Sequence, residues 1–174
     1  MQDNDEAGLI RQSLSGDHRT YAALVDRYKN ALYHHCFAIV RNEDAAEDVA
    51  QETFITAYYK LGLYKSEYKF STWLFKIATN KALNHIKKAA KEVSADDALM
   101  AAIASTQRGP FQLAQDSELH AAVENLQPKY RAVISLYYWR GMNYQEISQV
   151  MGAPHGSVKG WMNRAKLQLR KELS

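Results

Sequence analysis

Apolar residues recur at three- and four-residue steps through most of the chain, which is the spacing of one face of an α-helix. The first clear run is followed by Asn42, a favoured N-cap residue, and then by Glu43 and Asp44, whose charges suit the positive end of a helix. The pattern predicts one helix before Asn42 and a second that ends near Gly62. The expected buried positions are Leu24, Tyr28, Leu32, Cys36, Ile39 and Val40, then Ala46, Val49, Ala50, Thr53, Phe54 and Ala57.

A third helix is predicted after a short segment at residues 63–69. Ser71 or Thr72 can cap it, and its apolar face continues to about Ala90. The periodicity weakens over residues 92–116, where small and polar residues accompany Gly109 and Pro110. We interpret this stretch as a flexible linker.

Helical periodicity returns at Leu119. Pro128 suits the first position of a further helix, which Gly141 ends. The sequence therefore predicts an all-α protein of two small helical domains, at residues 1–91 and 117–174, joined by the linker at residues 92–116.

The sharpest local pattern lies near the C-terminus. Asn143 and Glu146 are spaced as in a capping box, and Gly152 ends the short helix that they begin. A longer helix with basic residues begins after Pro154. A short helix, a turn that contains glycine and a second, basic helix are the layout of a helix-turn-helix.

Composition excludes several classes of protein. Of the 174 residues, 47% are hydrophobic and 24% are charged, which favours a folded chain. The single cysteine, Cys36, excludes a disulfide scaffold. The N-terminus is acidic, so we expect no signal peptide, and the longest apolar run, residues 98–104, is too short to span a membrane. We expect a cytoplasmic protein without membrane insertion.

The net charge of +3 conceals a strong segregation of charge along the chain. Residues 43–52 contain five acids and no base, whereas residues 60–91 contain eight lysines and one acid. Residues 92–124 carry a net charge of −5, and residues 155–172 carry +4. Two basic regions predict two contacts with nucleic acid, because neutralising phosphates gives affinity that does not depend on base sequence. For either region alone, an ordinary solvated helix face is the alternative.

Rings and amides accompany the first basic region. Asn80 and Asn84 lie one helical turn apart, and aromatic residues stand between the lysines. Aromatic rings and amides beside lysines suit single-stranded bases, which stack and offer free hydrogen-bonding edges. Some of these rings must instead belong to the core, Trp73 above all. The aromatic residues are Tyr64, Tyr68, Phe70, Trp73 and Phe75.

The acidic segment at residues 43–52 also has a regular pattern. Four of its polar residues recur at three- and four-residue steps and share one helix face, which Phe54 extends: Asp44, Glu47, Asp48 and Gln51. Such a face can dock a basic partner surface. From the residues alone, a solvated face beside a core phenylalanine is the simpler interpretation.

The sequence holds no pattern typical of catalysis. It contains no phosphate-binding loop, no dinucleotide glycine motif, and no zinc-protease or serine-hydrolase signature. His34, His35 and Cys36 are adjacent, but consecutive helical residues point about 100° apart and cannot chelate one ion. We expect no metal, no cofactor and no enzymatic activity.

Taken together, these motifs resemble the extracytoplasmic-function group of bacterial sigma-70 factors. In the first domain the resemblance rests on DAAEDVAQETF at 44–54 and STWLFKIATN at 71–80, followed by Asn84, Lys87 and Lys88. In the second it rests on LQPKYRAVI at 126–134, YQEI at 144–147, GSVK at 156–159, RA at 164–165 and LR at 169–170. Each motif is modest alone, but their order and spacing are specific. The resemblance covers nearly the whole chain outside the linker and the first dozen residues.

The resemblance implies a sigma region 2 bundle and a sigma region 4 helix-turn-helix. It implies that core RNA polymerase binds Asp44, Glu47, Asp48, Gln51, Glu52 and Phe54. It implies that the single-stranded minus-10 element of the promoter binds Tyr64, Lys65, Tyr68, Lys69, Phe70, Asn80, Asn84, Lys87 and Lys88. Extruding a base from that strand costs a few kcal/mol, which its pocket must offset. The duplex minus-35 element would bind His155, Ser157, Lys159, Asn163 and Arg164.

Two departures from the family pattern bear on recognition. Gly160-Trp161 stands where the family more often has Ser-Arg, so minus-35 recognition rests on Lys159, Asn163 and Arg164. The loop YKSEYKF at 64–70 lacks a glycine common in the family, which leaves the captured base open.

The resemblance also implies an anti-sigma factor that would hold the two domains together. A stand-alone helix-turn-helix regulator is the alternative function. Such a regulator would not need the acidic face at residues 44–54.

Overall fold

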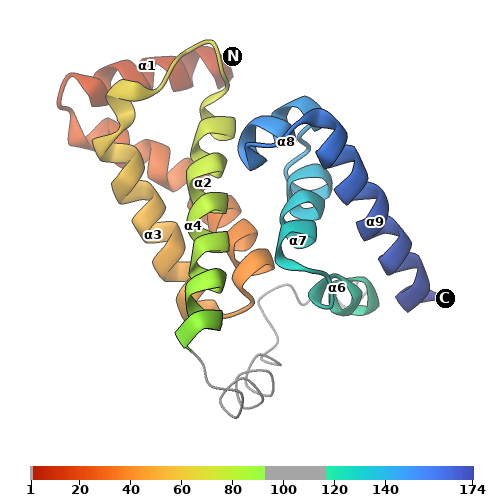
Figure 1. Cartoon of the computed structure of the whole chain (residues 1–174). Coiled ribbons are helices and arrows are strands. Elements are labelled where there is room, and N and C mark those ends of the chain that lie inside the picture. The colour runs from red at the N-terminus through yellow and green to blue at the C-terminus, as the bar shows by residue number, and fades with distance from the viewer. Residues whose placement is uncertain (1, 93–116) are drawn as a thin grey trace.

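The computed structural model describes residues 2–92 and 117–174, and all regular elements within these ranges are helical. The first domain contains α1 (Gln2–Leu14), α2 (His18–Val40), α3 (Glu43–Tyr59), the short 3₁₀ helix η1 (Leu61–Leu63) and α4 (Phe70–Glu92). The second contains α6 (Ser117–Glu124), α7 (Pro128–Ile134), the π-helical turn η2 (Ser135–Trp139), α8 (Tyr144–Met151) and α9 (His155–Leu173). Figure 1 shows these two groups of helices side by side. The predicted all-α class is confirmed, and the expected linker lies outside the described residues except for Glu92.

Local capping explains where several helices begin. The Asn42 side chain accepts a hydrogen bond from the Ala45 amide at 2.9 Å, as predicted for the start of α3. Asn143 and Glu146 form the predicted capping box at α8. The predicted third helix is present as α4, but its predicted N-cap was wrong, because the helix already begins at Phe70 and therefore includes Ser71 and Thr72.

Helix α1 was not foreseen. Its sequence is polar, and Ile10 is its one apolar residue in the buried core. Polar contacts help to hold α1 on α2: the Arg27 guanidinium pairs with Asp5 at 3.0 Å, and the Tyr28 hydroxyl donates to Glu6. An element held by such distant contacts leaves little hydrophobic periodicity in the sequence.

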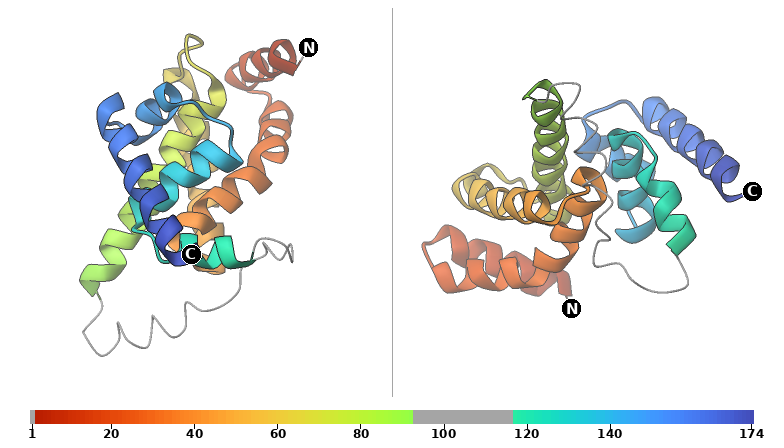
Figure 2. Two further views of the ribbon diagram at one scale, coloured as in Figure 1. Left: turned by 90° about the vertical axis from the view of Figure 1, so that its right-hand side faces the viewer. Right: turned by 90° about the horizontal axis from the view of Figure 1, so that it is seen from below.

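The two domains share a continuous core. Helices α2 and α4 of the first domain pack against α7, η2 and α8 of the second, and Figure 2 shows the same neighbours from two further directions. One cluster of buried apolar residues contains members from both domains, among them Phe37, Ile39 and Leu136. The predicted burial of Cys36 is confirmed, and burial raises the pKa of its thiol to about 12.

His35 is the buried polar centre of this boundary. Only 1% of the residue is exposed. Its Nε2 lies 2.8 Å from the Thr79 hydroxyl on α4, and its Nδ1 lies 2.9 Å from the Ser135 hydroxyl on η2. Burial, together with a smaller effect of the Arg140 charge, lowers the pKa of His35 to about 3. The neutral ring therefore joins three elements from both domains.

The free energy of unfolding should therefore decrease when the pH is lowered from about 6.5. Between pH 6.5 and 3 the unfolded chain binds a proton at His35 that the folded chain excludes, so the free energy of unfolding decreases as pH falls, by up to about 1.4 kcal/mol per pH unit. Urea denaturation between pH 7 and 4.5 measures this slope. His35→Gln should be less stable at pH 7 and should have a shallower slope; equal slopes in the two proteins would contradict the assignment.

Candidate nucleic-acid and partner interfaces

The acidic surface follows α3. All five of its polar residues are exposed: Asp44, Glu47, Asp48, Gln51 and Glu52. Gln51 Nε2 donates to a Glu47 carboxylate oxygen at 3.4 Å. Burial raises the pKa of the nearby Tyr33 hydroxyl, and the carboxylates of α3, with Glu43 and Glu47 first among them, raise it further. This face therefore presents a concentrated negative potential to solvent.

Phe54 lies at the side of this surface rather than at its centre. Its side chain is partly buried against the core, and its carbonyl accepts a hydrogen bond from the Tyr21 hydroxyl. The exposed apolar side chains of α3 are instead Ile55, which is 58% exposed, and Tyr59, which is 81% exposed. Positions 48, 55 and 59 share a helix face. Sequence reasoning missed these two residues, although their spacing from Asp48 carried the signal.

The loop between η1 and α4 holds the first set of predicted DNA contacts. The Tyr64 hydroxyl donates to the Tyr68 carbonyl at 2.5 Å, which closes the loop on itself. Tyr68 is 48% exposed, whereas Phe70 is only 4% exposed and packs its ring near those of Tyr64 and Trp73. The Tyr68 ring is therefore exposed and could stack on a base. The buried Phe70 ring instead packs under the loop, against the protein core. Lys65 and Lys69 are exposed.

Helix α4 carries the second set. Asn80, Asn84, Lys87 and Lys88 are all exposed, and their spacing places them along one side of the helix. The same stripe includes the exposed Lys76 and Lys91, which the predicted site did not contain. From Lys76 to Lys91 the helix rises about 22 Å. The structure thus provides a long basic track with amides at its middle.

Helix α9 is the second helix of the helix-turn-helix. Gly152 adopts a left-handed conformation with φ +61° and ends α8, and α9 begins at His155. Its buried side is Val158, Met162, Ala165 and Leu169. The predicted contact residues His155, Lys159, Asn163 and Arg164 are exposed, while Ser157 is half-buried. Lys159, Asn163 and Arg164 therefore project away from the core.

The departures at residues 160 and 161 have a structural explanation. Trp161 is half-buried, and the ammonium group of Lys129 lies 5.3 Å from the centre of its ring. This residue therefore packs against α7. Gly160 has open space where a Cβ would be.

Gly160→Ala should stabilise the protein by about 1 kcal/mol, because glycine weakens a helix interior by that amount relative to alanine. The added methyl group meets no atom within 4 Å. Thermal unfolding of the two proteins measures the difference. An unchanged or lower melting temperature would show that the helix backbone here is not regular.

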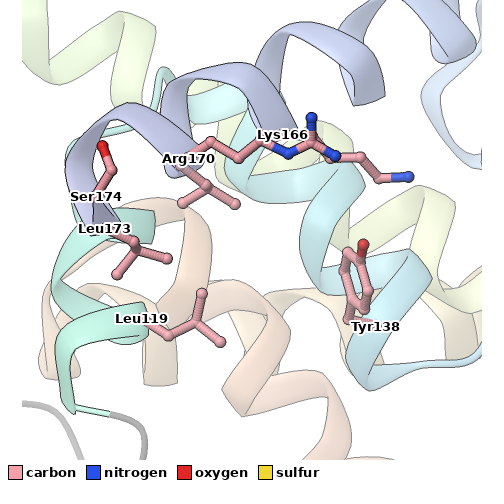
Figure 3. A pocket seen from close by; sticks show the side chains of 7 residues that line it. Leu119, Tyr138, Lys166, Arg170, Leu173 and Ser174 are labelled. Carbon is pink, nitrogen blue, oxygen red and sulfur yellow. The ribbon is translucent and has the colours of Figure 1, made fainter.

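An apolar groove of about 590 Å³ lies between α6, η2 and α9. Figure 3 shows Leu119 and Leu173 near one end, Tyr138 at the other, and Lys166 and Arg170 along α9. Leu119, Tyr138 and Leu173 are exposed large apolar residues. Sequence reasoning missed this groove, because its walls come from elements separated by some fifty residues of chain. Its chemistry suits an amphipathic helix with acidic side chains.

The described residues contain no candidate metal site and no candidate membrane-spanning helix. Among residues 2–92 and 117–174, no cluster of His, Cys, Asp and Glu side chains could hold a metal ion. In the same part of the chain, none of the helices has the length and apolar character needed to cross a bilayer.

Comparison with known proteins identifies the family to which this chain belongs. The profile of sigma-70 region 2 matches residues 24–92, and that of sigma-70 region 4 matches residues 116–169. The ECF RNA polymerase sigma factor SigW of Bacillus subtilis is 33% identical, over 94% of each chain. The RNA polymerase sigma-H factor of Pseudomonas aeruginosa is 30% identical, over 99% of this chain and 95% of the relative.

Solved structures of other proteins have the same fold as this chain. CnrH, in complex with the cytosolic domain of CnrY, is 25% identical and superposes with a TM-score of 0.71 over 97% of both chains. The sigma factor RpoE of Bartonella quintana, 20% identical, has the same fold with a TM-score of 0.69, over 88% of this chain and 96% of its own. By sequence, by domain order and by fold, the chain belongs to the extracytoplasmic-function group of the sigma-70 family.

Proposed function

We propose that this chain is an alternative sigma factor whose three charged surfaces have three different partners. The acidic face of α3 binds core RNA polymerase, the basic track of α4 with its preceding loop binds the minus-10 element, and α9 binds the minus-35 element. The observation that carries this proposal is the separation of charge on the folded chain. Six exposed polar residues of α3, five of them acids, lie on a different helix from the exposed basic residues of α4 and α9.

The α3 surface distinguishes this function from that of a stand-alone helix-turn-helix regulator. A regulator that binds duplex DNA alone has no use for an exposed acidic helix beside Ile55 and Tyr59. A polymerase subunit needs such a surface, because complementary charge speeds association and selects the partner. Titration of purified core polymerase with the labelled chain tests the choice. Saturable binding that weakens with added salt is expected, and no binding at low salt would favour the regulator.

The α4 surface suits melted DNA rather than duplex. The exposed Tyr68 ring offers a stacking face, and Asn80 and Asn84 offer donors and acceptors to the free edges of bases. The lysines on either side can neutralise phosphates of the same strand. This division supports a role in opening the promoter, with the extruded base captured near the loop at residues 64–69.

The α9 surface suits the major groove. A helix of this size fits that groove, and Arg and Asn side chains form paired hydrogen bonds with guanine and adenine respectively. Asn163 and Arg164 are the exposed residues of these types in the first ten residues of α9, where Lys159 is also exposed. They would recognise bases of the minus-35 element, and the more C-terminal basic residues would contact phosphate.

An anti-sigma factor is the fourth proposed partner. CnrH was solved with the cytosolic domain of CnrY, and RpoE with the anti-sigma factor NepR. In this chain the groove beside Leu119 and Leu173, with Lys166 and Arg170 at its edge, would accept an apolar helix that carries acidic groups. We further propose that the chain has no catalytic activity of its own, and that it works in the cytoplasm, where bacterial polymerase and chromosome are found.

A further inference from the structure

Helix α1 meets α2 through two neighbouring acids. Asp5 pairs with the Arg27 guanidinium at 3.0 Å, and the carboxylate of Glu6 accepts a hydrogen bond from the Tyr28 hydroxyl. The first pair is exposed to solvent, with 67% of the Asp5 side chain accessible, so it contributes little to stability. Glu6 and Tyr28 are both half-buried. The bond between Glu6 and Tyr28 is therefore the better shielded of the two.

Tyr28 connects this bond to the loop that precedes α4. The centre of its ring lies 5.7 Å from that of Phe70, and the Phe70 ring lies 5.5 Å from that of Tyr64. The Tyr64 hydroxyl in turn donates to the Tyr68 carbonyl. A continuous series of packed rings thus runs from an acid of α1 to the residue whose exposed ring is proposed to stack on a base.

The Glu6 carboxylate also acts on Tyr64 through its charge. Burial raises the pKa of both phenols; at Tyr28 the hydrogen bond to Glu6 raises the pKa further, and at Tyr64 the charge of Glu6 does so. Both hydroxyl groups therefore stay protonated at neutral pH and can donate. Helix α1 also contacts η1, and Figure 1 shows α1 beside the segment that joins α3 to α4.

Two hydrogen bonds at Tyr68 hold the shape of the loop. Its amide donates to the Lys65 carbonyl at 3.1 Å, and its carbonyl accepts from the Tyr64 hydroxyl at 2.5 Å. Both groups belong to the backbone, so the two bonds set the direction in which the exposed Tyr68 ring leaves the chain. A site that is held in its binding form beforehand binds more tightly, because less conformational entropy is lost. Loosening the loop should therefore weaken its hold on a base.

We propose that Glu6 and Tyr28 are positioning residues for the minus-10 loop, and that α1 braces this loop in the form that captures an unpaired base. Both residues act through the rings of Phe70 and Tyr64. The inference rests on the proposed function in one respect, that the loop at residues 64–69 binds the melted strand. Helix α1 precedes residues 24–92, the part of the chain that matches sigma-70 region 2. The brace is thus an addition to the matched region.

Three variants separate this hydrogen bond from the rest of α1. Tyr28→Phe removes the hydroxyl but keeps the ring beside Phe70, and Glu6→Ala removes the acceptor. Glu6→Gln keeps an oxygen that can accept from Tyr28, so it should behave as wild type. Asp26→Ala is the matched control, because it takes an exposed acid from its 3.0 Å pair with Lys29 on the same helix as Tyr28.

Amide hydrogen exchange of the free chains, followed by NMR, measures the order of the loop. Tyr28→Phe and Glu6→Ala should speed exchange of the Tyr68 amide about tenfold, roughly the effect of losing one hydrogen bond. Glu6→Gln and Asp26→Ala should exchange as wild type does. Exchange at residues 74–82, inside α4, should stay unchanged in all four variants. Equal acceleration there would show general destabilisation and would overturn the positioning role.

Promoter opening is measured on the same proteins at saturating core polymerase, by permanganate reactivity on a promoter selected with the wild-type chain from genomic fragments. Tyr28→Phe and Glu6→Ala should form about five- to tenfold less open complex, whereas Glu6→Gln and Asp26→Ala should stay within about twofold of wild type. Affinity for core polymerase should be unchanged in all four variants, because the α3 surface is intact.

Three results would overturn the brace. They are opening within about twofold of wild type in both Tyr28→Phe and Glu6→Ala, a Glu6→Gln variant as defective as Glu6→Ala, and a loss of opening without faster exchange at Tyr68. If the wild-type chain binds core polymerase but opens no promoter, or does not bind it at all, the proposed function fails and the positioning role fails with it. Exchange at Tyr68 would still report whether α1 holds the loop.

Discussion

Replacing Glu47 and Asp48 together with lysine is expected to weaken binding to core RNA polymerase at least a hundredfold. Both side chains are exposed on α3, so their loss removes no packing in the first domain. The change converts attraction to a basic partner into repulsion, and like charges placed together at an interface cost several kcal/mol. A hundredfold loss corresponds to about 2.8 kcal/mol. Fluorescence titration of core polymerase at two salt concentrations measures the effect.

A matched control separates local recognition from net charge. Glu92→Lys with Glu118→Lys makes the same change in charge at exposed residues of α4 and α6. This control should bind polymerase within about threefold of wild type, since long-range charge effects are screened beyond about 10 Å. An equal loss of affinity in both double variants would show that the α3 surface is not the specific contact.

Replacing Asn80 and Lys88 together with alanine is expected to block promoter opening while polymerase binding remains intact. Both residues are exposed on α4, a different helix from the one that carries the acidic surface. Loss of one base contact and one phosphate contact should cost about 2–4 kcal/mol, or roughly 30- to 1,000-fold in formation of the open complex. Permanganate reactivity of unpaired thymines near the minus-10 element reports the opening.

The control for this variant removes the same residue types elsewhere. Asn30→Ala with Lys60→Ala changes an exposed asparagine on α2 and an exposed lysine after α3. It should open promoters as wild type does. If Asn80→Ala with Lys88→Ala instead lost polymerase binding to the same extent as promoter opening, the assignment of α4 to melted DNA would be wrong.

The helices of both domains were predictable because their signals are local. Asn42, Asn143 and Glu146 bond to backbone groups within three residues, and the buried side of α9 repeats at helical spacing. Helix α1 was missed because polar side chains twenty-two residues away on α2 help to hold it. The boundary between the domains was not predictable for the same reason. Arg131 donates to the carbonyls of Ala38 and Ile39, which lie more than ninety residues away, and nothing in the pattern near Arg131 indicates these partners.

The candidate site was predictable where exposure follows from helical spacing. The acids of α3 and the amides of α4 lie on solvent-facing sides, as their periodicity indicates. The roles of the aromatic residues were harder to predict, because the same spacing suits a ring in the core and a ring that stacks on a base. The fold resolves this ambiguity: Phe70 is buried, Tyr68 is free, and a rotation of one helical position separates the half-buried Phe54 from the exposed Ile55.

Transcription in vitro tests the central claim most directly. Purified core polymerase is mixed with this chain and a pool of genomic fragments from the same organism, and the RNA ends are mapped. The account predicts new transcripts that start downstream of a shared pair of elements, and that disappear with Glu47→Lys, Asp48→Lys. Binding of the chain to DNA in the pool, with no binding to core polymerase and no new RNA start, would contradict it.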